Sequence, residues 1–298
     1  MVATPYITPD YLRAAPTGIA WGTIPDRSAT IAQQTAELAN ICWRATHTVD
    51  GICNQVLRAT VDTETHRGPD YRVTVDASGV GRIQVTRWPV LELLGASVSP
   101  AANFPRSWTT YGPAQLDSTP SMAGVYGSSA YGAGGTGPMS VMCVPGMIDW
   151  AAGRNGYLIH LAYVNGWPHS SLTASVNAGS ASVSMDDCTG MTGALLSVYD
   201  GADTETVTVL STSASTGPGV ATLSAPVVFP HPAGVLFTTL PQSVLWATVL
   251  LAVSQALTRG ATATTVQRQP GTASGSGKDP AEMATEAEIL LAPYRRVI

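Results

Sequence analysis

Charge is scarce in this sequence. Asp, Glu, Lys and Arg make up 12% of its 298 residues, about half the usual share, and Lys278 is the single lysine. Proteins that bind nucleic acid need clustered Lys and Arg to neutralise phosphates, whereas the cluster found here is Arg295-Arg296 in a chain of formal net charge −5. The composition therefore excludes sequence-specific nucleic-acid binding as the main function.

Long hydrophobic runs are also absent. The first ten residues, MVATPYITPD, contain neither the basic nor the apolar part of a signal peptide, so we expect no secretion signal. The most apolar stretch, Val244–Val253, is ten residues long, whereas a membrane span needs about twenty. We interpret this stretch as part of a buried core helix and expect no membrane partner.

Catalytic and metal-binding motifs are missing. There is no G-x-S-x-G and no H-E-x-x-H. Gly271–Asp279 resembles a phosphate-binding loop, but Thr272 stands where the first glycine is required. Asp200, Asp203 and Glu205 surround a predicted turn, yet three carboxylates fall short of the oxygens that Ca²⁺ requires. The expectation is that the chain is not an enzyme and has no catalytic residue, cofactor or metal.

Neither the histidines nor the cysteines show ligand spacing. We expect structural roles for the five histidines, with His66 just after a helix and His169 and His231 in loops. Cys42 and Cys53 lie on one face of a predicted helix but about 16 Å apart along its axis, too far for a disulfide. Buried free thiols in a reducing compartment are expected.

Helical patterns lie near the two ends of the chain. The clearest runs over Ser28–Val61, where apolar residues form one stripe and Thr30 with Gln33 fits a capping box. Trp43 points about 120° away from the centre of this stripe, so it either packs under a neighbouring hairpin or meets an adjacent subunit. A short helix is predicted from Thr8 to Ala14, and a helix apolar on all sides over Pro241–Arg259.

The middle of the chain has the pattern of strands and loops. A hairpin is predicted from Tyr71–Asp76 and Gly81–Thr86. An arm rich in Gly, Ser and Pro follows over 99–140. Its tyrosines Tyr111, Tyr126 and Tyr131 suggest that it lies against another surface, and the alternative is that the arm is disordered. Further strands are expected over Val90–Val98, Val141–Val144, Tyr157–Val164, Ala181–Met185, Ala194–Tyr199, Thr204–Leu210, Val220–Ser224 and Gly234–Thr238.

The C-terminal residues predict a tethered helix. A polar linker over 261–277 precedes Asp279, an N-cap followed by Pro280. The apolar stripe of this helix, with Met283, Leu290 and Leu291, is too narrow to fold alone. It must dock on its own core or on a neighbour, and residues 279–298 should be removable without loss of the fold.

Together these patterns predict an α+β protein. Its core would comprise residues 1–170, including the arm, and 240–260, a helical connector core with β-hairpin elements. A small β-barrel or sandwich would be inserted over 171–239, followed by a flexible linker and docking helix over 261–298.

Several segments resemble a known family. They are YITPDYLRAAPTGIAWGTIP, the amphipathic helix IAQQTAELANICWRATHTVDGICNQVLRAT, RWPVLELLGASVS, YLIHLAYVNGWP and HPAGVLFTTLPQSVLWATVLLAVSQALTRG. In this order the chain resembles the head-to-tail connector, or adaptor, proteins of tailed bacteriophages. The long arm and the β-module depart from the compact core of small adaptors.

The resemblance implies a structural virion protein at the head–tail interface, assembled in the host bacterial cytoplasm. About twelve copies would form a ring beneath the portal protein, above a stopper or tail-completion protein, and DNA would pass through without specific binding. The C-terminal segment would reach the portal. The candidate portal or subunit interface comprises Trp43, Tyr111, Tyr126, Tyr131, Met283, Leu290, Leu291, Tyr294, Arg295 and Arg296.

A second interpretation stays open. The chain could be a β-rich binding module built around residues 171–239, which decorates a capsid or tail or binds carbohydrate. Carbohydrate sites use exposed aromatic residues, and this segment offers mainly Tyr199, Phe229 and Phe237.

Overall fold

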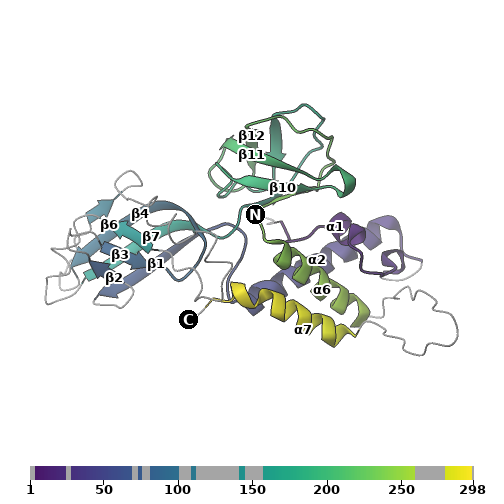
Figure 1. Cartoon of the computed structure of the whole chain (residues 1–298), viewed down its shortest axis with the longest axis horizontal. Coiled ribbons are helices and arrows are strands. Elements are labelled where there is room, and N and C mark those ends of the chain that lie inside the picture. The colour runs from purple at the N-terminus through teal and green to yellow at the C-terminus, as the bar shows by residue number, and fades with distance from the viewer. Residues whose placement is uncertain are drawn as a thin grey trace. The chain divides into compact units, whose positions relative to one another are not determined.

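A computed structural model describes residues 4–24, 28–68, 73–75, 81–100, 109–111, 141–144, 157–258 and 279–296. Most of the predicted arm, with Tyr126 and Tyr131, and the predicted linker lie outside these residues. The chain forms two compact units, one from Met1–Leu57 with Pro168–Arg295 and one from Arg58–Trp167 with Arg296–Ile298. Helices and sheets occur together, which agrees with the α+β class (Figure 1).

The α-helices that the structure describes lie in the first unit. Thr8 caps α1 (Pro9–Ala14), with proline at its start. The capping box of Thr30 and Gln33 begins α2 (Ile31–Cys53). Two further helices are α6 (Gln242–Thr258) and α7 (Pro280–Leu291), and short 3-10 turns form η1 (Trp21–Thr23) and η4 (Ala292–Tyr294).

The helix α2 is shorter than predicted. It ends at Cys53 because Asn54 adopts a left-handed conformation (φ 53°), with its N–H bonded to the carbonyl groups of Asp50 and Gly51. The prediction of helix as far as Val61 is therefore wrong, since Thr60–Gly68 forms strand β1. His66 accordingly lies in a strand and is buried.

The first unit also contains a small β-barrel. Its strands follow the order β8-β13-β10-β11-β12-β9, and every neighbouring pair is antiparallel. The two edges of this sheet meet at a bridge between Leu172 and Met185, which closes the barrel. The strands are β8 (His169–Ser171), β9 (Ser182–Met185), β10 (Leu195–Tyr199), β11 (Glu205–Thr212), β12 (Gly219–Leu223) and β13 (Leu236–Thr238), with a 3-10 turn η3 (Gly201–Asp203).

The barrel confirms the five strands predicted in this segment and adds β8, which places His169 in a strand instead of a loop. Its core is filled by side chains that alternate along the strands, such as Leu196 and Val198 of β10. Phe237 lies in the same core and is fully buried.

The second unit consists of two antiparallel sheets. The larger has the order β1-β7-β4-β5, and the smaller has the order β2-β3-β6. Val73 pairs with Ile83 in the smaller sheet, which confirms the antiparallel pairing predicted for the hairpin. The strands are β1 (Thr60–Gly68), β2 (Val73–Val75), β3 (Gly81–Gln84), β4 (Val90–Pro100), β5 (Thr109–Tyr111), β6 (Val141–Val144) and β7 (Tyr157–Asn165).

Candidate interaction site

The C-terminal helix α7 packs on its own chain. Met283, Ala287 and Leu291 are at most 5% exposed, and α7 contacts α6 and α2. Ser254 Oγ, near the end of α6, donates to the carbonyl oxygen of Pro280 at the start of α7 (2.8 Å). The sequence left open whether this helix docks on its own core or on a neighbour. In this structure it docks on its own core, because its apolar stripe packs against the chain's other helices.

The other end of α7 is held by polar contacts. The hydroxyl groups of Ser243 and Tyr294 are 2.8 Å apart, and Gln55 Nε2 donates to the carbonyl oxygen of Tyr294 (2.9 Å). Since Ser243 lies at the start of α6 and Tyr294 follows the end of α7, the two helices run antiparallel along their length (Figure 1). The contacts at both ends fix the register of the pair.

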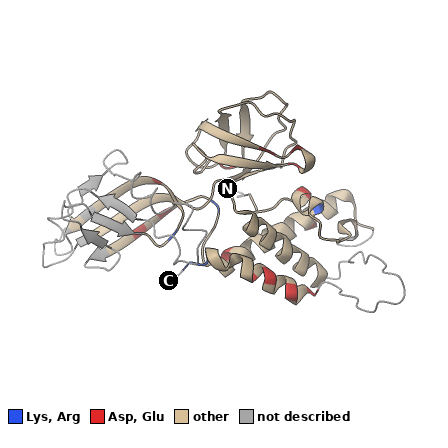
Figure 2. Cartoon of the chain, viewed as in Figure 1, with Lys and Arg blue, Asp and Glu red and all other residues tan. Residues whose placement is uncertain are grey.

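The solvent face of α7 is acidic. Glu282, Glu286 and Glu288 are exposed. Figure 2 shows acidic positions in red along α7. Ile289 on the same face is 68% exposed. Arg295 forms a 3.5 Å ion pair with Glu288, in which both side chains are about half exposed. An acidic surface with one exposed isoleucine is thus what this helix presents to other molecules.

The predicted interface residues have different environments. Trp43 is half-buried and stacks on His47 of its own helix, with ring centres 5.6 Å apart. Leu290 is half-buried, whereas Met283, Leu291 and Tyr294 are buried within their own chain. The backbone of Tyr111 pairs with Ala96 between β5 and β4. The interface role of these residues stays a prediction, and a partner could reach the buried ones only after α7 has left α6.

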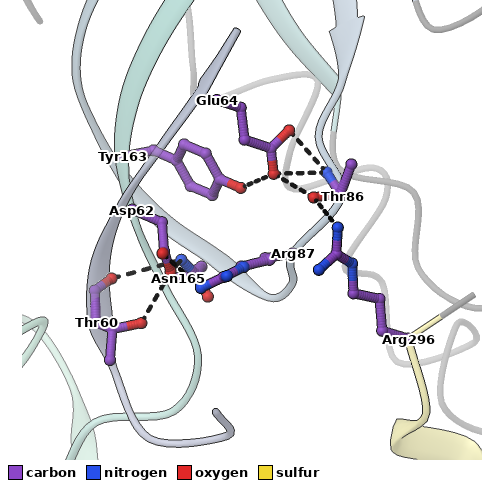
Figure 3. Close-up of polar contacts among 8 residues, drawn as sticks. All are labelled: Thr60, Asp62, Glu64, Thr86, Arg87, Tyr163, Asn165 and Arg296. Carbon is purple, nitrogen blue, oxygen red and sulfur yellow. Dashed lines mark hydrogen bonds and ion pairs between the residues drawn. The ribbon is translucent and has the colours of Figure 1, made fainter. Parts of the chain in front are cut away.

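A network of buried polar groups lies in the second unit, centred on Glu64 of β1 (Figure 3). The Glu64 side chain is 12% exposed. Its oxygens accept hydrogen bonds from the backbone N–H of Thr86 (3.0 and 3.1 Å), from the Thr86 hydroxyl and from the Tyr163 hydroxyl. His66 Nε2 lies 3.1 Å from the same carboxylate.

These contacts determine the protonation of Glu64. Burial alone would raise its pKa, but the hydrogen bonds from His66, Thr86 and Tyr163 outweigh burial and lower the pKa to about 2. The carboxylate is therefore ionised at neutral pH and already saturated with donors. Such a group stabilises the fold and is poorly suited to proton transfer near pH 7.

The same sheet holds a second carboxylate. Asp62 forms an ion pair with Arg87 and accepts hydrogen bonds from Asn165 Nδ2 (2.6 Å) and the Thr60 hydroxyl (3.0 Å). Both carboxylates, which the sequence analysis did not single out, thus serve the packing of β1 against its neighbours. The one sequence signal for them is the spacing of Asp62, Glu64 and His66 at every second residue, which is the period of a strand face.

Arg296 joins this network from the C-terminal end. Its Nη2 donates to the Thr86 hydroxyl oxygen (2.9 Å), and the Thr86 hydroxyl in turn donates to Glu64 (Figure 3). The Nε atom of Arg296 is buried without a hydrogen-bond partner among the described residues. Arg296, predicted to lie at an interface, therefore contacts the loop between β3 and β4 of its own chain.

In the barrel, two of the three carboxylates considered for Ca²⁺, Asp200 and Glu205, contact a histidine. His231 is buried, its Nδ1 is 2.9 Å from Asp200 and its Nε2 is 2.8 Å from Glu205. Glu205 also accepts the backbone N–H groups of Val228 and Phe229. Within the described ranges, no group of three His, Cys, Asp or Glu side chains could hold a metal ion.

Three thiols can be compared with the prediction of buried free cysteines, and all three agree with it. Cys42, Cys53 and Cys188 are free and buried. Burial raises the pKa of Cys42 and of Cys53 to about 12. In these surroundings the thiols pack as small apolar side chains.

The length and apolar character of a helix decide whether it can span a membrane. Among the residues that the structure describes, no helix is long and apolar enough to cross a bilayer.

Comparisons with protein-family models, with curated proteins and with solved structures found nothing that matches this chain. Its function must therefore be inferred from its own residues.

Proposed function

We propose that this chain is a structural protein of a tailed bacteriophage particle, a head-to-tail adaptor. In this proposal about twelve copies form a ring beneath the portal, join the capsid to the tail and continue the DNA channel. The ring contacts the portal above and a stopper or tail-completion protein below, at the neck of the virion. The proposal rests on the family resemblance together with three features of the structure.

The first feature is the position of the segments that carry the resemblance. They contribute α1, α2, β4, β7 and α6, each a regular element with bounds close to those expected, apart from the end of α2. The helices from the two ends of the chain, α2 and α6, pack together, and the barrel is formed by residues between them. This arrangement suits a helical connector core with an added β-module.

The second feature, which carries most weight, is a barrel surface with almost no charge. Residues 188–199 and 206–230 contain no Asp, Glu, Lys or Arg, and Figure 2 shows the barrel nearly without coloured charges. Leu195 and Leu210 are each 64% exposed and Val228 is 67% exposed. Single exposed apolar side chains are ordinary, but here the segments that carry them contain no charged residue to oppose contact with another protein. Such a surface suits a subunit that is covered in an assembly.

The third feature is the acidic solvent face of α7. The three glutamates leave this helix a surface that attracts basic residues of a partner, while its apolar face remains on α6. In the adaptor proposal this partner is the portal protein, and arginine or lysine side chains of the portal would face Glu282 and Glu286. The contact would weaken as the salt concentration rises.

The test is the size of the purified chain, alone and mixed with the portal protein of the same phage. Light scattering behind a sizing column, followed by negative-stain imaging, should show co-elution of the two proteins as a ring-shaped complex. A chain that remains monomeric beside the portal and is retained on a glycan column would instead support the β-rich binding module.

A further inference from the structure

A cavity lies in the first unit, where three elements converge. It is bordered by α1 and the turn after it, by the β10–β11 end of the barrel, and by the first turns of α6. Its volume is about 550 Å³, within the range of cavities that bind small molecules or short peptide segments. All its lining residues are among those the structure describes. No function considered above uses this cavity.

Aromatic rings line the cavity. Tyr11 of α1 and Tyr199 of β10 contact each other edge to face, with centres 5.6 Å apart and planes at 83°. Trp246 of α6 lines the same space, together with Pro16 and Pro232. Because Tyr11, Tyr199 and Trp246 are each half-buried, their rings offer apolar surface that remains accessible.

Hydrogen bonds hold two of these rings in place. The Tyr199 hydroxyl donates to Gln242 Oε1 (2.8 Å), and Gln242 Nε2 donates to the Tyr11 hydroxyl oxygen (3.3 Å). Because the Tyr11 oxygen accepts the hydrogen bond from Gln242, the Tyr11 O–H remains available to donate to a ligand. Trp246 also lines the cavity, and its indole N–H is a group that can donate but not accept a hydrogen bond. The cavity therefore combines fixed aromatic surfaces with hydrogen-bond donors.

The charge of the lining is negative. Asp10 and Asp200 contribute carboxylates, and no Lys, Arg or His lines the cavity. Asp10 is 84% exposed and forms an ion pair with Arg13, and Asp200 contacts His231. Phosphates and carboxylates are therefore poor ligands for this site, and a neutral or cationic ligand fits it better.

We propose that this cavity binds an extended, proline-containing peptide segment of a partner protein, with an arginine or lysine next to the prolines. Proline rings pack on aromatic side chains, and an extended proline-rich backbone leaves its carbonyl oxygens without internal partners. Tyr11 and Trp246 supply donors for such carbonyl groups, and Asp10 supplies a carboxylate for the basic residue. This inference does not depend on the adaptor proposal.

The experiment is a nuclear magnetic resonance titration of the full chain, labelled with ¹⁵N in its tryptophans. The indole signal of Trp246 is identified by its loss in Trp246→Phe. The probe is a blocked hexapeptide of sequence PPPRPP, and the matched control peptide is AAARAA. The Trp246 signal should shift in a saturable manner with PPPRPP, at least tenfold more tightly than with AAARAA.

Variants locate the binding site. Tyr199→Ala should weaken PPPRPP binding at least tenfold, and Tyr11→Phe, which removes only the hydroxyl donor, at least threefold. Asp10→Asn should reduce the advantage of PPPRPP over the uncharged hexapeptide PPPAPP. Ile31→Ala, at a side chain 81% exposed and outside the cavity lining, should bind as the unchanged chain does. Dispersed tryptophan signals would show that each variant remains folded.

Several results would overturn the proposal. They are the absence of any saturable shift at millimolar PPPRPP, equal binding of AAARAA, and unchanged binding by a folded Tyr199→Ala variant. A saturable shift with maltohexaose or chitohexaose in place of the peptide would assign the cavity to carbohydrate instead. None of these results bears on ring formation, so the adaptor proposal is tested separately.

Discussion

The hydroxyl groups of Ser243 and Tyr294 lie 2.8 Å apart, which ties the end of the chain's last helix to the start of α6. Together with the burial of Leu291 and Met283, this contact makes α7 part of the folded core. In place of the expectation that residues 279–298 can be removed without loss of the fold, we predict that their removal destabilises the first unit. Removal would expose the apolar surface of α6 to water.

The packing of α7 can be tested by truncating its buried side chains. Leu291→Ala and Met283→Ala should each lower the free energy of unfolding by about 2–5 kcal/mol, because each leaves a cavity against α6. Urea denaturation followed by helical circular dichroism gives this quantity. Ile289→Ala, on the exposed face of the same helix, is the control and should change stability by less than about 0.5 kcal/mol. Equal effects at positions 289 and 291 would contradict the observed docking.

The Glu64 network predicts a dependence of stability on pH. The folded pKa of about 2 is below the ordinary value of 4.5, so the ionised carboxylate stabilises the fold above about pH 4.5. This contribution is lost as the pH falls from 4.5 through 2. Glu64→Gln should therefore destabilise the larger sheet at pH 7 by roughly 3 kcal/mol, and the difference from the unchanged chain should shrink on acidification.

Amide hydrogen exchange in β1 and β7 measures how much Glu64→Gln changes the local stability of the larger sheet. Glu92→Gln is a matched control, because Glu92 is an exposed carboxylate on β4 of the same sheet. A constant difference between Glu64→Gln and the unchanged chain from pH 7 to pH 3 would show that the network does not hold the carboxylate ionised.

The buried thiols should be inert in the folded chain. Because burial raises the pKa of Cys42 and Cys53 to about 12, little thiolate forms at neutral pH. In a Cys143→Ser background, Ellman's reagent should react with no thiol under native conditions and with three in urea. Rapid reaction of one thiol in the native state would show that its site opens.

The acidic face of α7 is predicted to contact the portal. Glu282→Lys with Glu286→Lys should weaken portal binding at least tenfold. The free energy of unfolding should fall by no more than about 1 kcal/mol, because both side chains are exposed and Glu282 lies in the first turn of α7. The control is Glu92→Lys, a single charge reversal at an exposed position on β4. Binding by the α7 variant that equals that of the control would place the portal contact elsewhere on the chain.

Much of the fold could be predicted from local patterns. The capping box of Thr30 and Gln33 located the start of α2, and Asp279 with Pro280 located the start of α7. Alternation of apolar residues located the barrel strands because one face of each is buried. These signals depend on residues within a few positions of one another.

Strand β1 was missed because its pattern is reversed. Asp62, Glu64 and His66 are the more buried set, whereas Val61 is 44% exposed. Leu57 and Val61 also continue the four-residue spacing of the preceding helix, and the left-handed Asn54 that ends it was not recognised as a stop signal. Charged residues become the buried face only when distant donors such as Tyr163 satisfy them.

The candidate sites were harder to predict because the residues that form them are far apart in the sequence. Glu64 and Tyr163 are 99 positions apart, and Tyr11 and Gln242 are 231 positions apart. No local pattern indicates that such residues meet. The apolar stripe of α7 could be predicted, but whether it covers its own chain or a partner depends on the surface of α6.

The most direct test of the adaptor proposal is an electron-microscope image of purified phage particles in which this chain carries a gold-labelled tag. The proposal predicts label at the junction between head and tail, as a single ring at the neck of each particle. Label spread over the capsid faces or the tail fibres, or particles that lack the chain, would contradict it.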